Sequence, residues 1–215
     1  MPVWKHRRIY HMTDALNWTS IQQHGLLSTS RLLNLSGLDG AERYDLERRQ
    51  RLQTGRLPNG AVIRDQLPMS PQALSRCLAN GLVPEDWYLE LNSRVFFWLD
   101  PQRLNRQRHA CGSSPQIVLA VDARHLLSSY LRQTALTPFN AGNARRRPAR
   151  RGRETFVPFD KWCESGWSWE TVALQTPLRP SSHPPVELAI ADAVEDVMDF
   201  VVDVRRLDPG EYLSL

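Results

Sequence analysis

Short apolar runs alternate along this chain with segments of helical periodicity. Residues 6–12 (HRRIYHM) are expected to form a first strand that enters the core. Thr13 or Asp14 can cap a helix over residues 15–24, whose apolar side chains recur at helical spacing. Gly25 follows as the C-terminal stop of this helix.

Two central runs are apolar throughout, as expected of strands covered on both faces: residues 95–99 (VFFWL) and residues 116–122 (QIVLAVD). Two more strands are predicted near the C-terminus, within residues 185–191 (PVELAIA) and 199–206 (DFVVDVRR). The segment 60–66 (GAVIRDQ) is a shorter candidate for a strand.

Helical segments lie between these strands. They cover residues 29–35, 41–55, 71–81, 84–94, 102–108 and 123–132. Strands interleaved with helices, but adjacent in pairs at the end, favour an α+β fold with a mixed sheet over a regular parallel winding. Neither a repeat nor a long linker divides the chain, so residues 1–215 are expected to form one domain.

Residues 138–160 have little periodicity, and we expect a basic, mobile loop at about 138–158. Its arginines fall within nine residues: Arg145, Arg146, Arg147, Arg150, Arg151 and Arg153. This concentration favours a polyanionic partner, and the planar guanidinium group suits phosphate. A solvated loop without a partner explains the same residues.

The remaining composition indicates an ordinary globular protein. Apolar residues make up 41% of the 215 residues, and 27 Lys and Arg against 23 Asp and Glu give a net charge of +4. We expect no membrane association, because no apolar stretch approaches the roughly 18 residues that span a bilayer. Three cysteines without a CxxC pair and an N-terminus without an apolar signal segment favour the cytoplasm.

Several common catalytic signatures are absent from the sequence. It contains no GxxxxGK[ST], GxGxxG, HExxH or GxSxG motif and no zinc-ligand spacing. The six histidines are scattered, so no metal cofactor is expected.

Three short elements remain as candidates for a site: the end of the first strand at His11, the aromatic residues Phe97 and Trp98, and Glu187. A hydrogen-bonded structural histidine and core aromatics are the ordinary explanations of the first two. Glu187 stands in the apolar pattern VELAI and must face solvent, a partner or a site, because an unpaired buried carboxylate is costly.

Taken in this order, the elements resemble the ADP-ribosyltransferase superfamily, in particular its bacterial branch related to DNA-targeting ADP-ribosyltransferase toxins and uncharacterised relatives. The segment IYHMTDALNWTSIQQHGL resembles the family's early strand with a His-x-Thr element, a helix and a Gly-Leu. VFFWLDPQRLNR resembles the middle strand and helix, and PVELAIADAV the late strand with the catalytic glutamate. The resemblance implies a split sheet with flanking helices.

The resemblance also implies NAD as substrate, with Glu187 and His11 as catalytic residues that meet across a cleft. Cleavage of the nicotinamide–ribose bond passes through an oxocarbenium-like transition state, which a carboxylate can stabilise. NAD contacts would come from Tyr10, His11, Thr13, Phe97, Trp98 and Arg103. The family's middle position is often tyrosine; Phe96, Phe97 and Trp98 keep ring stacking here but provide no phenolic hydrogen bond.

A macromolecule is the implied acceptor, with nucleic acid slightly preferred over protein. Acceptor contacts are expected from the basic loop, at Asn140, Arg145, Arg146, Arg147, Arg150 and Arg151. Glu154 is a rival acidic candidate, but it is expected to pair with a neighbouring arginine.

Three other functions fit the same residues. An NAD-dependent RNA 2′-phosphotransferase would use Arg7 and Arg8 near the first strand. A nucleic-acid-binding module without catalysis would need the basic loop alone, and a purely structural protein would need neither. No apolar stripe indicates a dimer.

Overall fold

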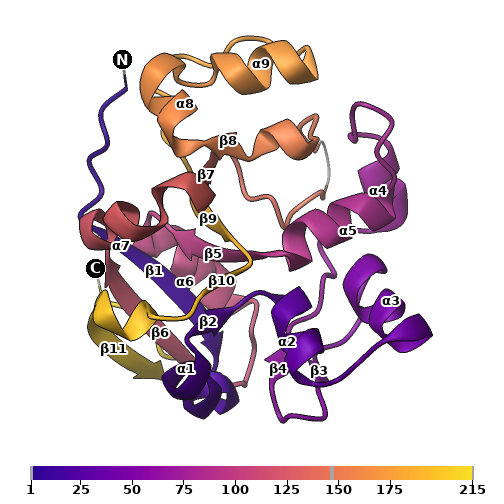
Figure 1. The fold of residues 1–215 in the computed structure, drawn as a ribbon, viewed down its shortest axis with the longest axis vertical. Coiled ribbons are helices and arrows are strands. Elements are labelled where there is room, and N and C mark those ends of the chain that lie inside the picture. The colour runs from indigo at the N-terminus through magenta and orange to yellow at the C-terminus, as the bar shows by residue number, and fades with distance from the viewer. Residues whose placement is uncertain (1, 146–147, 215) are drawn as a thin grey trace.

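A large antiparallel sheet with helices on both faces forms the centre of the molecule (Figure 1). The structure is a computed structural model, and it describes residues 2–145 and 148–214. The strands are β1 Arg8–Asp14, β2 Leu26–Leu27, β3 Gly55–Arg56, β4 Val62–Ile63, β5 Arg94–Trp98, β6 Gln116–Asp122, β7 Thr134–Thr137, β8 Val157–Pro158, β9 Glu187–Ala191, β10 Ala193–Val194 and β11 Val201–Leu207.

The helices lie between these strands in the chain. They are α1 Trp18–His24, α2 Thr29–Leu35, α3 Gly40–Arg48, α4 Pro71–Ser75, α5 Pro84–Asn92, α6 Pro101–His109, α7 Ala123–Tyr130, α8 Phe159–Ser165 and α9 Ser168–Leu174, with short 3-10 turns η1 Ala15–Asn17, η2 Leu131–Gln133, η3 Arg153–Thr155 and η4 Val197–Asp199. The α+β class is therefore confirmed. No helix in the described parts of the chain is long and apolar enough to cross a membrane.

The strand order of the main sheet is β11-β6-β1-β5-β9-β7-β8. The prediction of a mixed sheet is wrong, because the pairs between the described strands are all antiparallel. Strands that pair in this sheet, such as β1 and β6, are separated by several elements in the chain, so the order of strands and helices along the sequence does not reveal their relative direction. One isolated parallel bridge, Leu78 with Arg151, lies outside the strands.

The main sheet has its shortest strand pairing between β1 and β5. β1 pairs with β6 along its whole length, but with β5 only where Tyr10 faces Trp98. Beyond this pair, the His11 side chain contacts β5 through Nδ1, which lies 2.8 Å from the Phe96 carbonyl oxygen. A side chain thus replaces the next bonds of the ladder.

The two faces of the sheet are covered differently. One face packs against α1, α7 and α8 in a single large apolar cluster that includes Phe97, Leu119 and Leu188. The other face carries two separate clusters: α4 and α5 cover the β5–β9–β7 half, and Leu104 of α6 covers the β1–β6 half. This divided face carries the candidate site.

Several predicted elements end earlier or begin elsewhere than expected. The helix predicted over 41–55 ends at Arg48, because the chain turns back and the Arg51 side chain donates to the carbonyl oxygens of Leu46 and Arg64. The predicted helix 71–81 ends at Ser75. The predicted loop at 138–158 is also interrupted, since η3 and β8 lie within it.

Gly25 is a point at which the fold requires glycine. Its φ of 72° lies in the left-handed region, and a Cβ here would overlap the carbonyl oxygens of Val194 and Glu195. We expect Gly25→Ala to lower the free energy of unfolding by about 2 kcal/mol. Gly37 has a similar φ of 69° with open space around it, so Gly37→Ala should lower the free energy of unfolding by only about 1 kcal/mol. Urea denaturation of both variants measures the two losses. Equal losses for both would contradict the steric argument.

Candidate functional site

A transverse row of side chains crosses the divided face of the sheet. Glu187 faces Trp98 on one side and Thr137 on the other, and Trp98 faces Tyr10. Residues directly opposite each other in paired strands project to the same face. Tyr10, Trp98, Glu187 and Thr137, hereafter the Glu187 row, therefore share one surface of the sheet.

The Glu187 carboxyl group is held through one of its two oxygens. It is buried, with 5% of the residue exposed. The Ala141 N–H donates to Oε2 at 2.9 Å, and Thr137 Oγ1 lies 3.0 Å from the same atom. Within residues 2–145 and 148–214, no hydrogen bond reaches Oε1. The carboxyl group is thus oriented, with one oxygen left to contact a ligand.

Burial dominates the electrostatics of this carboxyl group and raises its pKa to about 7. The bonds from Ala141 and Thr137, and the more distant charges of Arg151 and Arg103, lower the pKa but do not offset the burial. Near neutral pH both the protonated and the ionised form of the group are therefore populated. A strongly perturbed carboxyl group of this kind is typical of functional sites.

The aromatic members of the row, Tyr10 and Trp98, are half-buried and pack beside Leu104 of α6. The Trp98 indole N–H donates to the Gln107 side chain, which fixes the ring. Arg103, also on α6, is half-buried and lies 3.9 Å from Asp100. Four residues proposed from the sequence are thereby brought to one face: Tyr10, Trp98, Arg103 and Glu187.

The expectation that His11 meets Glu187 is wrong. His11 pairs with Leu119 of β6. Its ring packs in a T-shaped arrangement with Phe97, with 5.7 Å between the ring centroids. Because strand side chains alternate, a residue adjacent to Tyr10 projects to the opposite face of the sheet. Burial lowers the pKa of His11, against a smaller opposing effect of the Phe96 carbonyl. His11 is therefore a structural residue at the β1–β5 junction.

Two further predicted NAD contacts also lie on the opposite face or within the core. Phe97 is fully buried in the main apolar cluster, so its ring is not available to a nicotinamide. Thr13 Oγ1 accepts a hydrogen bond from Asn17 Nδ2 at 2.8 Å. Asn17 in turn bonds the Val62 backbone N–H and carbonyl, which ties β4 to the end of β1. Thr13 and Asn17 thus join two parts of the fold.

Arg151 does not serve the expected role in acceptor binding. Its side chain is 1% exposed, and its guanidinium donates to the carbonyl oxygens of Ala141, Asn143 and Ala149 at 3.0–3.1 Å. The guanidinium carbon also lies 4.9 Å from the Phe139 ring centroid. The interior position arises because Arg151 N and O bond the backbone of Cys77 and Ala79, which draws the residue inward. Arg151 fixes the loop that supplies the Ala141 N–H.

Three other predicted acceptor residues are described by the structure and lie around this fixed loop. Asn140 is half-buried and immediately precedes Ala141, so it lies beside Glu187. Arg145 and Arg150 are exposed. Arg146 and Arg147 lie outside the described residues.

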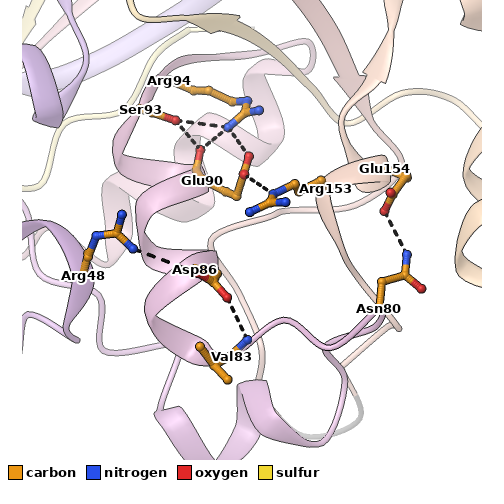
Figure 2. Close-up of polar contacts among 9 residues, drawn as sticks. All are labelled: Arg48, Asn80, Val83, Asp86, Glu90, Ser93, Arg94, Arg153 and Glu154. Carbon is orange, nitrogen blue, oxygen red and sulfur yellow. Dashed lines mark hydrogen bonds and ion pairs between the residues drawn. The ribbon is translucent and has the colours of Figure 1, made fainter.

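The end of the basic segment is held against α5 (Figure 2). Arg153 Nε donates to Glu90 at 2.9 Å, and Glu90 also pairs with Arg94. The prediction that Glu154 pairs with a neighbouring arginine is wrong, since its described partner is Asn80 Nδ2 at 3.3 Å. Glu154 is half-buried on η3 and is not a member of the Glu187 row.

Sequence reasoning missed two contributors to the site, Thr137 and the Ala141 N–H. The alternation in TALT, residues 134–137, was a weak signal for the strand that carries Thr137. The Ala141 contact is made by backbone and leaves no signal in residue type. Among the described residues, no three His, Cys, Asp or Glu side chains gather in a way that could hold a metal ion.

Comparison with known sequences adds a family. A search of curated proteins found no match. The family described as "Family of unknown function (DUF7002)" matches residues 7–201, a span that includes the whole Glu187 row and the basic segment. Because the match covers most of the chain, this protein belongs to the DUF7002 family.

Proposed function

We propose that this protein cleaves NAD and transfers ADP-ribose to a macromolecular acceptor, with nucleic acid preferred over protein. The observation that carries the proposal is the Glu187 carboxyl group, buried, fixed through Oε2 and flanked by the half-buried rings of Trp98 and, one strand further, Tyr10. An oriented carboxylate beside an aromatic surface suits a ribose that carries a planar leaving group.

In the proposed reaction the bond between ribose C1′ and the nicotinamide nitrogen breaks, and its electron pair leaves with nicotinamide. Positive charge develops on the ribose, as in glycoside cleavage. The ionised Glu187 stabilises this charge and accepts a hydrogen bond from a ribose hydroxyl through Oε1. A nucleophilic atom of the acceptor then bonds C1′ and releases its proton.

Other residues of the same face have supporting roles in the proposal. Trp98 stacks on the nicotinamide ring or bounds its pocket, and Tyr10 continues the aromatic surface. Arg103 is close enough to lower the pKa of Glu187, which makes it the candidate for contact with the pyrophosphate. His11, Thr13 and Phe97 have no catalytic part in this proposal, because they project to the face of the sheet opposite Glu187.

The single pair between β1 and β5 also supports an ADP-ribosyltransferase-like fold. The resemblance implies a split sheet, and a sheet joined at only one pair beside Glu187 is compatible with such a split. The exposed Arg145 and Arg150 support a nucleic-acid acceptor, because they follow the loop that contacts Glu187.

The proposal is tested by incubating the protein with NAD labelled in the adenine moiety and a panel of acceptors: single-stranded DNA, RNA, duplex DNA and a protein lysate. We expect label on nucleic acid and release of free nicotinamide. An internally 2′-phosphorylated RNA is included, since loss of its phosphate with NAD would favour the RNA 2′-phosphotransferase function. If the protein releases no nicotinamide and transfers no label to any acceptor, the enzymatic proposal is overturned.

A further inference from the structure

A hollow of about 680 Å³ lies where β1 begins and where β5 and β6 end. Its lining includes Lys5, Arg7, Arg8, Tyr10 and Asp122; we call it the N-terminal hollow. Three cationic side chains therefore line it together with one carboxylate. Such a concentration of one sign of charge in a concave surface attracts anions.

These cations are only partly balanced by carboxylates. Asp122 faces Arg8 across the β1–β6 pair, and the Asp203 carboxylate, which pairs with Arg205, also interacts with the charge of Arg8. In the described parts of the chain, Lys5, Arg7 and Arg8 form no ion pair within 4.0 Å. Asp122 is engaged as the cap of α7, where it accepts from the His125 N–H at 2.9 Å. The hollow thus keeps an excess of positive charge.

A second hollow of about 480 Å³ near α2 provides the contrast. Its arginine, Arg31, pairs with Glu195 at 2.7 Å and lies 3.6 Å from Asp192. The charge there is already compensated, so no anion is needed to explain it. The difference singles out the N-terminal hollow as the anion site.

Tyr10 links the N-terminal hollow to the Glu187 row, since it belongs to both. The row crosses four adjacent strands. Its last member, Thr137, is fully buried and donates to the Phe139 carbonyl oxygen, and the loop that follows leads to the exposed Arg145. Adjacent strands lie about 4.8 Å apart, so the row is about 14 Å long. Basic side chains therefore lie beyond both ends of a row that carries two aromatic rings.

We propose that the N-terminal hollow binds phosphate groups of a single-stranded nucleic acid, which crosses the Glu187 row toward Arg145. The identification of this strand as the acceptor rests on the function proposed above; the binding does not. Lys5, Arg7 and Arg8 contact the backbone phosphates, which positions the strand without reading its sequence. Exposed bases can stack on the half-buried rings of Tyr10 and Trp98, and only an unpaired strand offers them.

The test is the affinity of the full chain for a fluorescein-labelled 12-nucleotide single-stranded DNA, measured by anisotropy in 50–200 mM NaCl without NAD. An RNA of the same sequence, run in parallel, tells which nucleic acid supplies the phosphates. Arg7 and Arg8 are exposed, so Arg7→Gln/Arg8→Gln should keep the wild-type melting temperature. The double variant should bind about tenfold more weakly at 50 mM NaCl, and the slope of log K against log salt should fall by about 1.4.

A matched control is Arg56→Gln/Arg132→Gln, which removes two positive charges from exposed arginines on β3 and η2. It should bind like the wild type. Equal weakening in both variants, or unchanged binding in Arg7→Gln/Arg8→Gln, would overturn the proposal. So would weaker NAD binding by that variant in calorimetry with unchanged DNA and RNA affinity, since the hollow would then serve the pyrophosphate of NAD. If only Arg7→Gln/Arg8→Gln loses affinity for DNA or RNA, the N-terminal hollow binds nucleic acid, even if the protein never cleaves NAD.

Discussion

Replacing Glu187 with glutamine is expected to raise the free energy of unfolding by about 3 kcal/mol at pH 8. Burial raises the pKa of the folded carboxyl group from 4.5 to about 7, and each unit corresponds to about 1.4 kcal/mol. Below pH 4.5 both states hold the proton and the carboxyl group costs nothing. As the pH rises toward 7 the unfolded state releases its proton first, so wild-type stability falls and then levels off above 7.

Glutamine keeps an oxygen that can accept from the Ala141 N–H, but it never ionises. Urea denaturation of both proteins from pH 4 to pH 8 measures the difference. The two curves should coincide near pH 4, separate progressively up to about pH 7 and run nearly parallel from there to pH 8. Glu154→Gln changes a half-buried carboxyl group that accepts only a 3.3 Å bond from the Asn80 amide, and it should stay within about 0.5 kcal/mol of the wild type throughout. A glutamine variant less stable than the wild type at pH 8 would contradict the burial argument.

Replacing Arg151 with alanine is expected to lower the free energy of unfolding by about 4 kcal/mol. Three carbonyl oxygens would lose a charged donor, and a cavity would open beside the Trp87 and Phe139 rings. The same change should loosen the loop that carries the Ala141 N–H. Urea denaturation measures the loss.

The neighbouring Arg150 provides the matched control, because it carries the same charge on an exposed side chain. Arg150→Ala should change the free energy of unfolding by less than about 0.5 kcal/mol. Arg151→Lys should recover only part of the loss, since a lysine cannot reach three carbonyl oxygens with a planar fork. Wild-type stability in Arg151→Ala would show that the arginine does not hold the loop.

Some elements of the fold were predictable because their own residues form a clear, bounded pattern. The helix at Thr29–Leu35 and the strand at Gln116–Asp122 have the predicted bounds. β7, α8 and α9 were missed. β7 has only four residues, and α8 and α9 follow each other with a break at Gly166, so no single helical period continues through this region. Buried aromatic residues of this region, such as Trp162 and Trp167, belong to the main apolar cluster, and such tertiary contacts are not indicated by local periodicity.

The candidate site was predictable in part. Glu187 interrupts an apolar strand, and this alone indicated an unusual environment. Its partners depend on strand register, which no local pattern specifies. A displacement of one residue distinguishes Tyr10 from His11 and Trp98 from Phe97, and the sequence offered both members of each pair as candidates. Arg151 and Arg150 are likewise adjacent and identical in type, yet one is buried and the other exposed.

The central claim is that Glu187 acts on the nicotinamide–ribose bond of NAD. Its most direct test is the rate of nicotinamide release by the wild type, Glu187→Gln and Glu154→Gln at pH 8, with the best acceptor present. The account predicts that Glu187→Gln lowers the rate at least about 100-fold, as for loss of an electrostatic stabiliser, while Glu154→Gln retains the wild-type rate. Nicotinamide release at the wild-type rate by a folded Glu187→Gln protein would contradict it.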